Sequence, residues 1–305
     1  MVSGLSLIRQ LCQYQAIKEL SEKRLYPVHK LCRILDVARS AYYRWLRSPK
    51  SKAELENEEL AVKINNIHLA HPDMGYRRIR DELRKNHNIY VNDKRVLRIS
   101  RALHIRSVVK HRRHGCTRAA AYPKHIAENY LNRQFTADEP NQKWLSDVTE
   151  FKYYTGPQVH KLYLSAILDL YDRRVVSYAL GNSNNNPLVL DTLDAAITAT
   201  PDAHPLFHSD RGFQYTSYLF HEKLKKAGIK HSMSRVAHCL DNGPMEGFWG
   251  ILKREMYYKR KFTTKEELAK AISKYIYYYN CQRAQRKLAI MTPMEYHDAY
   301  YSLVA

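Results

Sequence analysis

Three acidic residues of this chain have the types and positions that a metal-dependent reaction requires. Asp147 lies inside a segment of aromatic and β-branched residues (WLSDVTEF), Asp210 directly follows a short apolar segment (HSDRG), and Glu246 lies near the start of a stretch with helical periodicity (DNGPMEGFWGILKRE). Carboxylate oxygens are the ligands that Mg²⁺ prefers, and such ions can activate a nucleophile and stabilise a leaving oxygen. The three acids are therefore our candidate catalytic residues and metal ligands.

The spacing of these acids is weaker evidence than their positions. Sixty-two residues separate Asp147 from Asp210 and 35 separate Asp210 from Glu246, but the chain holds 30 Asp and Glu, so such intervals also arise by chance. An aspartate inside a strand is more informative, because a buried carboxylate without a partner or a metal is costly. Other roles stay open: Asp147 could pair with a lysine, Asp210 could form a turn, and Glu246 could close a capping box.

Lys253 follows Glu246 by seven residues. Because an α-helix returns nearly to register after seven residues, Lys253 is expected on the same helix face, where it could bind a DNA phosphate. Gly250 lies between the two and removes side-chain bulk, so DNA could approach this face closely. On the other side of the helix lie four apolar residues whose presence core packing alone explains: Phe248, Trp249, Leu252 and Met256.

The acids are predicted to be positioned by a mixed α/β sheet. Five segments have strand character: Lys143–Tyr153, His160–Asp169, Arg174–Leu180, Pro205–His208 and Ile229–Met233. The first three are linked by turns and are expected to be antiparallel, whereas helices separate the later ones. Asn186 is predicted to cap the first of these helices with Pro187 at its first position, and Ser217 to begin a helix that Gly228 ends. Two more helices follow, over Lys265–Asn280 and after Pro293.

The N-terminal residues 1–48 read as helices with a basic face. Two short helices, Val28–Leu35 and Ser40–Leu46, follow a longer one and are joined by a turn at Asp36-Val37-Ala38. This is the helix-turn-helix pattern, whose second helix enters the major groove of DNA. The candidate DNA contacts on or beside that second helix are Arg39, Tyr43 and Arg44. A small helical bundle with a solvated basic face remains the alternative.

Residues 49–104 are expected to form a second helix-turn-helix-like unit with helices over Glu54–Leu69, Tyr76–Arg84 and Asn92–Leu103. Asn92 or Asp93 would cap the last helix. Its buried stripe is predicted to be Val96, Ile99 and Leu103, and its opposite face carries the candidate DNA contacts Lys94, Arg95, Arg98 and Arg101. A basic linker over 105–139 follows, in which Arg112 and Arg113 are expected to lie along phosphates.

The composition agrees with a nucleic-acid partner. The chain of 305 residues has 50 Lys and Arg against 30 Asp and Glu, which gives a net charge of +20. Repulsion among these positive charges would destabilise the folded state unless a polyanion were present. Ribosomal and membrane-surface proteins are also basic, so charge does not decide alone. Five scattered cysteines without a CxxC pair argue against a disulfide framework or a zinc knuckle. With no secretory signal or long apolar segment, we expect a soluble, cytoplasmic protein without membrane contact.

Several long blocks carry a family resemblance. In order along the chain they are YPVHKLCRILDVARSAYYRWL, HPDMGYRRIRDEL, WLSDVTEF, LDLYDRRVVSYAL, HSDRGFQYTS, SMSRVAHCLDNGPMEGFWGILKRE, YIYYYN and MTPMEY. They are similar to the second-frame protein of bacterial insertion-sequence transposases of the IS-three family. The resemblance covers nearly the whole chain, and the HSDRG and DNGPMEGFWG blocks are its most specific parts.

The resemblance implies an α/β fold of the ribonuclease-H-like, retroviral-integrase type, a mixed sheet with flanking helices preceded by all-α helix-turn-helix domains. The catalytic core would span 140–260 and a C-terminal helical extension 261–305. Asp147, Asp210 and Glu246 would bind two Mg²⁺ ions, for which Mn²⁺ could substitute, and Lys253 would approach DNA. Such enzymes hydrolyse a phosphodiester at the element's end and use the freed 3′ hydroxyl to attack a second one.

The implied partners follow from this chemistry. They are double-stranded DNA (the element's terminal inverted repeats and a target), a second copy of the chain in a homodimer or higher assembly, and a protein from an upstream reading frame. The site of action would be the bacterial cytoplasm, at the nucleoid when DNA is bound. One departure from the family pattern is Ala237, which stands where glycine is expected in SMSRVAHC and would strain that loop if a positive φ were needed.

The sequence leaves two alternative functions open. A tyrosine recombinase is suggested by the 24 tyrosines, but these cluster in a helical region where packing explains them, and the acids would have no task. A catalytically inactive DNA-binding regulator derived from a transposase is the other alternative. Retention of all three acids speaks against it, and metal-dependent nicking of terminal-repeat DNA separates the two.

Overall fold

The computed structural model describes residues 3–23, 26–47, 52–108, 126–235 and 239–304. The chain divides into two compact units, residues 1–63 and residues 64–305. The division falls inside one helix, α4 (Lys52–Ala70). The acids identified above all belong to the second unit.

The secondary structure described in the first unit is helical, as predicted. Its elements are α1 (Ser3–Glu22), α2 (Val28–Ile34), α3 (Arg39–Arg47) and the beginning of α4. The chain turns between α2 and α3 at Asp36, which takes a φ of 53°, a left-handed conformation that aspartate tolerates better than most residues. A small core forms from Ile17, Leu31, Cys32 and Tyr42. The predicted pair of short helices with a tight turn is therefore confirmed.

The second unit begins with the end of α4, followed by α5 (Tyr76–His87) and α6 (Asp93–Ala102). The side chain of Asn92 accepts a hydrogen bond from the Lys94 backbone amide at 2.8 Å, so the predicted cap is confirmed. Val96 and Ile99 are buried as expected, but Leu103 is 38% exposed. The predicted stripe was wrong at Leu103, because α6 ends at Ala102 and the chain then turns away.

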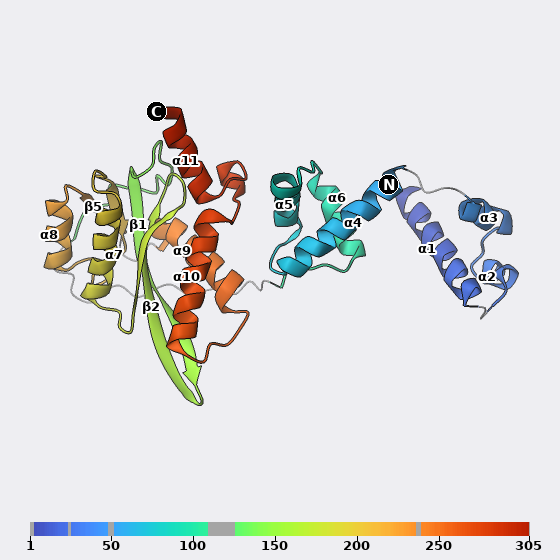
Figure 1. The fold of residues 1–305 in the computed structure, drawn as a ribbon, viewed down its shortest axis with the longest axis horizontal. Helices are drawn as coiled ribbons and strands as arrows, with labels where there is room; N and C mark the ends of the chain where they lie inside the picture. Colours follow the sequence, from blue (N-terminus) through green and yellow to red (C-terminus); the bar gives the residue numbers. More distant parts are fainter. Residues whose placement is uncertain (1–2, 24–25, 48–51, 109–125, 236–238, 305) are drawn as a thin grey trace. The chain divides into compact units, whose positions relative to one another are not determined.

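The centre of the second unit is a mixed five-stranded sheet (Figure 1). Its strands are β1 (Lys143–Thr155), β2 (Gln158–Asp169), β3 (Val175–Gly181), β4 (Leu206–Ser209) and β5 (Lys230–Met233), in the spatial order β3-β2-β1-β4-β5. The first three pair antiparallel, whereas β4 runs parallel to β1 and β5 parallel to β4. The predicted mixed sheet is confirmed, and it places β1 between β2 and β4.

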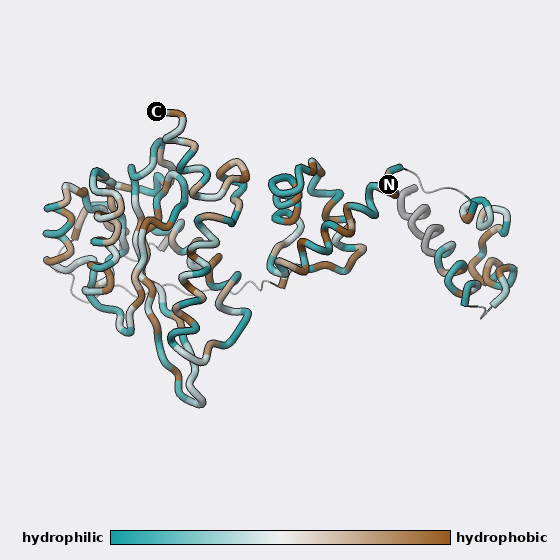
Figure 2. Tube along the Cα trace, viewed as in Figure 1, coloured by the Kyte–Doolittle hydropathy of each residue, from teal (hydrophilic) through white to brown (hydrophobic). Residues whose placement is uncertain are grey.

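Helices cover both faces of this sheet. They are α7 (Asn186–Ala199) and α8 (Tyr218–Lys226) on one face, and α9 (Gly243–Leu252) and α10 (Lys265–Cys281) on the other. Successive residues of a strand point to opposite faces, so Trp144 joins the core beneath α7 and α8 while Leu145 joins the core beneath α9 and α10. In Figure 2, hydrophobic positions recur along the strands in the middle of the sheet.

Local signals set the ends of these helices. The Ser217 side chain accepts a hydrogen bond from the Phe220 amide, and Gly228 takes a φ of +67° just beyond α8, both as predicted. The predicted cap of α7 was wrong by one residue. Asn185, not Asn186, caps α7, because its Oδ1 accepts from the Leu188 amide at 3.2 Å and so moves the helix start one residue earlier.

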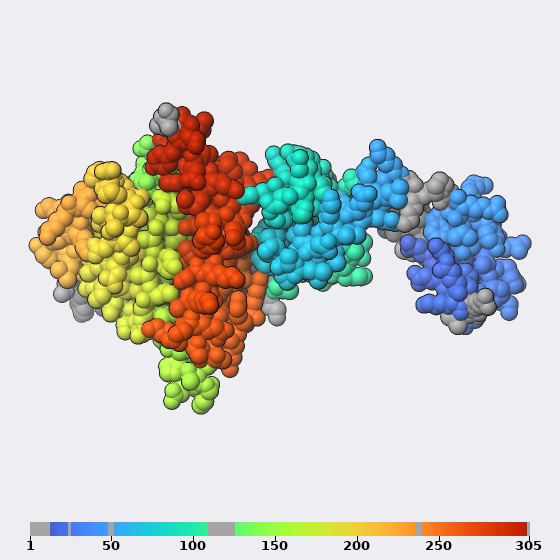
Figure 3. Space-filling view, viewed as in Figure 1, coloured from blue at the N-terminus to red at the C-terminus, as the bar shows by residue number. Residues whose placement is uncertain are grey.

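The C-terminal part continues directly from α9. The helix widens into a π-helical segment, η2 (Lys253–Tyr257), and is followed by α10, a short 3₁₀ turn η3 (Arg286–Leu288) and α11 (Pro293–Val304). In the space-filling view, α10 and α11 form a continuous surface beside the sheet (Figure 3). Within the described ranges, no helix has the length and apolar character needed to cross a membrane.

Candidate active site

The sheet register brings Asp147 and Asp210 together. Strands β1 and β4 run parallel, and Leu145 is the partner of His208. Each aspartate lies two residues beyond its member of this pair, so both emerge at the same level of the sheet. Two carboxylates with 62 residues between them in the sequence thus become neighbours, one inside β1 and the other just past the end of β4.

Asp147 is held by an indole. It is half-buried in the middle of β1, opposite Ala166 of β2, and its Oδ2 accepts a hydrogen bond from Trp249 Nε1 at 3.0 Å. Trp249 belongs to α9, three residues after Glu246, and the structure adds this hydrogen bond to the packing role that the sequence predicts for it. A buried indole N–H usually finds an acceptor, which is the one sequence signal that pointed to such a role.

Asp210 is held by backbone. Its Oδ1 accepts a hydrogen bond from the Gly212 amide at 2.8 Å, which is the turn-forming role that the sequence left open. A Cβ at position 212 would lie 2.9 Å from Asp210 Oδ1 and 2.9 Å from Gln214 Oε1, so a larger residue there would displace these two side chains. The turn fixes one carboxylate oxygen of Asp210 and leaves the other for a ligand.

The two aspartates repel each other. Burial raises the pKa of Asp147, and the neighbouring charge of Asp210 raises it further, to about 7 in all. Burial also raises the pKa of Asp210. The hydroxyl of Tyr215 lies nearby, 2.9 Å from Ser146 Oγ, and burial together with both aspartates raises its pKa well above the ordinary value. A cation between the two carboxylates would relieve this repulsion.

Glu246 lies on the helix layer that covers the face of the sheet carrying Asp147. It lies in the first turn of α9 with its side chain exposed, and its charge contributes to raising the pKa of Asp147. Although the residue is largely exposed, partial burial of its carboxyl group raises the pKa of Glu246 itself. Among the residues that the structure describes, no three side chains of the metal-binding types lie close enough together to form a complete metal site. The structure therefore shows a close pair of aspartates with Glu246 at the rim.

Lys253 lies at the junction of α9 and η2 and is half-buried. Its Nζ lies 5.2 Å from the centroid of the Phe151 ring, and burial lowers its pKa while the charges of Asp147 and Glu150 act in the opposite direction. The space beside Gly250, which we expected to be open to DNA, is taken by Arg254, whose Nη1 would lie 2.9 Å from an added Cβ. The helix face around Gly250 is therefore covered by basic side chains and is not left open.

Asp241, just before α9, was missed by sequence reasoning. It is fully buried, and it accepts hydrogen bonds from Arg133 Nε at 2.7 Å, from Arg235 Nη2 at 2.9 Å and from Asn129 Nδ2 at 3.1 Å. The hydrogen bond from Arg235 outweighs burial and, with Arg133, holds the pKa of Asp241 far below its ordinary value. Asp241 thus links the chain before β1, through Asn129 and Arg133, to the start of α9, the helix that carries Glu246.

The candidate DNA contacts form two separate sets. Lys94, Arg98 and Arg101 are exposed at helical spacing along α6, whereas Arg95 is half-buried. On or beside the second short helix of the first unit, Arg39, Tyr43 and Arg44 are exposed. The other residues singled out from the sequence, Arg112, Arg113 and Ala237, lie outside the described residues.

Comparison with family models gives three matches. A model described as an integrase core domain matches residues 137–239, and a second with the same description matches residues 246–300. A model described as an HTH-like domain matches residues 54–113. The first match contains Asp147 and Asp210, and the second begins at Glu246.

Whole-chain comparison finds relatives of similar length. The chain is 37% identical over 288 residues to the putative transposase InsK for insertion sequence element IS150 of Escherichia coli, covering 93% of this chain and 99% of that protein. It is 34% identical to an insertion element IS600 protein of 31 kDa from Shigella sonnei, covering 90% and 100%. A solved structure of the HTLV-2 integrase catalytic core domain in complex with magnesium matches with a TM-score of 0.43 and 22% identity, over 53% of this chain and 99% of that one.

Proposed function

This chain belongs to the insertion-sequence transposases of the IS-three family, and on that premise we propose that Asp147, Asp210 and Glu246 carry its catalysis. It is a transposase with the integrase-type core of the DDE polynucleotidyl transferases. The observation that carries the assignment of residues is the pair of repelling aspartates, one inside β1 and one just past the parallel strand β4, next to a helix that presents a glutamate.

The donor set suits a hard divalent cation. Asp147 is oriented by Trp249 Nε1 and by the Val148 backbone amide, Asp210 Oδ1 is fixed by the Gly212 amide, and Glu246 is exposed near them. Carboxylates alone, with no cysteine or histidine among them, favour Mg²⁺ or Mn²⁺ over zinc. Two such ions, when bound, would supply the positive charge that activates the attacking oxygen and stabilises the leaving oxygen.

In the proposed reaction, a water oxygen attacks the phosphorus at the element's end and the 3′ oxygen leaves as a hydroxyl. That hydroxyl then attacks a phosphodiester of the target, so one P–O bond forms for each that breaks. The chain's own part is orientation: Trp249 fixes Asp147, the Gly212 amide fixes Asp210, and Lys253 places a positive charge near Asp147. No side chain forms a covalent bond to DNA in this reaction.

The basic faces of α6 and α3 are the proposed DNA-binding surfaces. Three exposed basic residues at helical spacing on α6 fit phosphates along a groove, and the match to an HTH-like model supports a DNA-binding role for this region. We assign to these surfaces the terminal inverted repeats of the element. Since two ends and a target must meet, a homodimer or higher assembly belongs to the proposal, as does an upstream-frame partner protein.

The test is cleavage of terminal-repeat DNA by Glu246→Gln. The substitution keeps size and polarity but removes one metal-ligating charge, so cleavage with Mg²⁺ should fall by at least about a hundredfold while DNA binding stays within about twofold. Glu266→Gln, in the exposed first turn of α10, is the matched control and should cut at the wild-type rate. Cleavage by Glu246→Gln near the wild-type rate would refute the assignment, and a wild-type protein that binds but never cuts would make the chain a regulator.

A further inference from the structure

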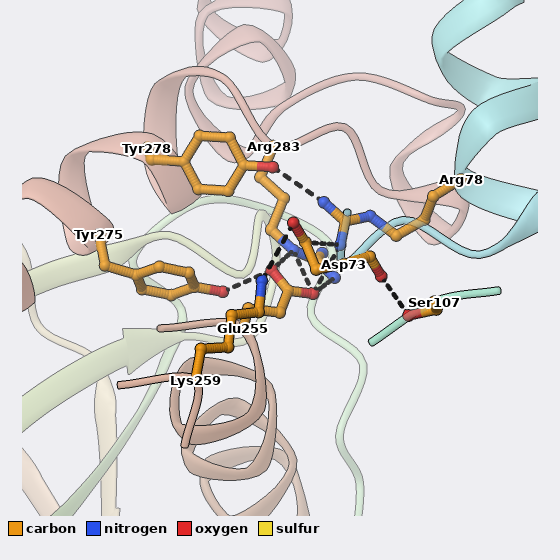
Figure 4. Close-up of polar contacts among 8 residues, drawn as sticks. All are labelled: Asp73, Arg78, Ser107, Glu255, Lys259, Tyr275, Tyr278 and Arg283. Atoms are coloured by element: carbon orange, nitrogen blue, oxygen red, sulfur yellow. Dashed lines mark hydrogen bonds and ion pairs between the residues drawn. The ribbon is translucent and has the colours of Figure 1, made fainter. Parts of the chain in front are cut away.

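A buried carboxylate lies at the far end of the catalytic helix. Glu255, in η2, is only 9% exposed at its side chain. It accepts hydrogen bonds from Arg78 Nη1 at 2.9 Å, from Arg283 Nη2 at 2.8 Å and from the Tyr275 hydroxyl at 2.8 Å (Figure 4). Burial would raise the pKa of Glu255, but the hydrogen bonds and charges of Arg283 and the charge of Arg78 hold it below its ordinary value. The group is therefore a carboxylate fully supplied with donors.

Arg78 extends this arrangement to α5. Its Nη2 donates to the Tyr278 hydroxyl at 2.8 Å, and its Nη1 also lies 2.8 Å from Asp73 Oδ2. Lys259 Nζ lies 3.2 Å from the other oxygen of Asp73. We call these seven residues the Glu255 cluster: Asp73, Arg78, Glu255, Lys259, Tyr275, Tyr278 and Arg283. Its members come from the helical region before residue 108 and from the segments that follow Glu246.

A second set of contacts joins the same two regions. Arg286, in η3, donates to Asp81 Oδ2 at 2.8 Å and to Asp93 Oδ1 at 2.9 Å. Asp93 is the first residue of α6. Lys85 of α5 forms an ion pair with Glu295 of α11. The helices α5 and α6 are thus held at three places to the C-terminal segments of the integrase-type domain.

Glu255 lies on the same helical segment as the proposed catalytic residue Glu246. The two glutamates lie nine residues apart on one continuous helical rod, α9 followed by η2. The π-helical turn is closed by a hydrogen bond from the Tyr258 amide to the Lys253 carbonyl at 2.8 Å, and Met256 anchors it in the core. Such wide turns inside helices often occur at functional sites. A displacement of Glu255 would therefore be transmitted to Glu246.

The junction leaves the DNA-facing side of α6 open. Asp93 is engaged by Arg286, but Lys94, Arg98 and Arg101 remain exposed. Helix α6 therefore has an exposed basic face that could bind a polyanion, and its first residue is fixed to the catalytic domain. The exposed basic face of α6 is therefore separate from the residues that make the three contacts.

We propose that the Glu255 cluster and the Arg286 contacts are positioning devices that fix where the transposase cuts. They hold the DNA-binding helix α6 at a set offset from the helix that carries Glu246, so the bond presented to the acids lies at a set distance from the sequence that α6 binds. This inference rests on the proposed function. Because a misplacement of about 1 Å can cost about a hundredfold in rate, rigid ion pairs at this junction have a direct effect on chemistry.

A merely stabilising junction would behave differently. It would lower the amount of folded protein, and the surviving molecules would still cut at the same bond. A positioning junction, once loosened, leaves binding intact while the cut spreads over neighbouring bonds. The distribution of cut sites therefore separates the two roles.

The experiment maps cuts on end-labelled terminal-repeat DNA with the full chain and Mg²⁺. Arg78→Met removes the bridge from α5 to Glu255, and Arg84→Met removes an equal charge from an exposed position of the same helix. We expect Arg78→Met to bind DNA within about twofold of wild type, to cut about tenfold more slowly, and to spread its cuts over several bonds. Arg78→Lys should be intermediate, because one ammonium cannot reach all three partners. Arg84→Met should cut at the wild-type position.

The outcomes are distinguishable. If wild type cuts at one bond and Arg78→Met cuts only at that bond, the positioning role is refuted while the proposed function stands. If the wild-type protein does not cut at all, the proposed function is refuted, and the positioning role that rests on it is refuted as well. Should Arg78→Met not fold, Arg286→Gln decides in its place, because it breaks the contacts to Asp81 and Asp93 from an exposed position.

The contact itself has a test that needs no activity. A zero-length carbodiimide reagent joins an amine to a carboxylate only when the two touch, so it should link Lys85 to Glu295 in the full chain. Glu295→Gln should abolish that link, and Arg84→Met should not affect it. A linked peptide missing from the wild-type digest, with or without DNA, would overturn the junction.

Discussion

Replacing Trp249 by phenylalanine tests whether the indole N–H orients Asp147. The variant keeps an aromatic ring in the core but loses the donor that lies 3.0 Å from Asp147 Oδ2. The carboxylate then keeps only its hydrogen bond from the Val148 backbone amide, and the repulsion from Asp210 acts on it without the opposing bond from the indole. We expect weaker binding of Mg²⁺ and an unchanged affinity for DNA.

The magnitude follows from the strength of the lost bond. A hydrogen bond to a charged group contributes about 1.5–3 kcal/mol, which corresponds to about 10- to 150-fold in an equilibrium constant. Asp147 is half-buried, so solvent screens part of this, and the lower end applies. Removal of the group that orients a metal ligand typically costs about 10- to 100-fold in metal affinity, which agrees. We therefore expect the Mg²⁺ concentration at half-maximal cleavage to rise about tenfold.

The assay is a Mg²⁺ titration of cleavage with DNA binding measured in parallel. Phe248→Leu is the matched control, because Phe248 is the buried neighbour on α9 and packs on Tyr279 with a ring separation of 4.9 Å. It should lower stability without changing the Mg²⁺ dependence. A Trp249→Phe variant with the wild-type Mg²⁺ dependence would show that the indole does not orient Asp147.

Two further predictions concern other parts of the second unit. Asp241→Asn should lower the free energy of unfolding at pH 7 by about 1–3 kcal/mol, since the two arginines it loses are themselves partly exposed. Because the folded-state pKa of Asp241 is depressed from 3.8, the gap between wild type and variant should be complete above about pH 5 and shrink as pH falls below 3.8 in urea titrations; a gap independent of pH would contradict the ion-pair account. Arg98→Ala on α6 should lower the slope of log affinity against log salt by about 0.9, and an unchanged slope would remove α6 from the DNA interface.

Local signals in the sequence were sufficient for most elements. The antiparallel strands, the caps at Asn92 and Ser217 and the left-handed Gly228 each depend on residues within a few positions, so their patterns predicted them. The cap of α7 was wrong by one residue because two adjacent asparagines offer the same side chain, and only the position of the Leu188 amide selects Asn185. The predicted burial of Leu103 was wrong because periodicity does not show where a helix ends.

The acids themselves were predictable for the same reason. Asp147 is unusual inside a strand, Asp210 follows a strand, and Glu246 opens a helix, so residue type and local context pointed to all three. The roles of Trp249 and Asp241 could not be read in this way. Each acts on a partner more than a hundred residues away, through contacts that exist only once β1, α9 and the segment before β1 are packed.

The sequence by itself determined the elements, the family and the identity of the acids, because these depend on residue type, periodicity and long characteristic blocks. Only the tertiary structure decided that the register of β1 and β4 places Asp147 beside Asp210, that an indole steadies one of them, and that Glu255 binds Arg78 across 177 residues of sequence. The physical reason is that burial and mutual charge act over a few ångströms of space, and distance along the chain carries no information about them.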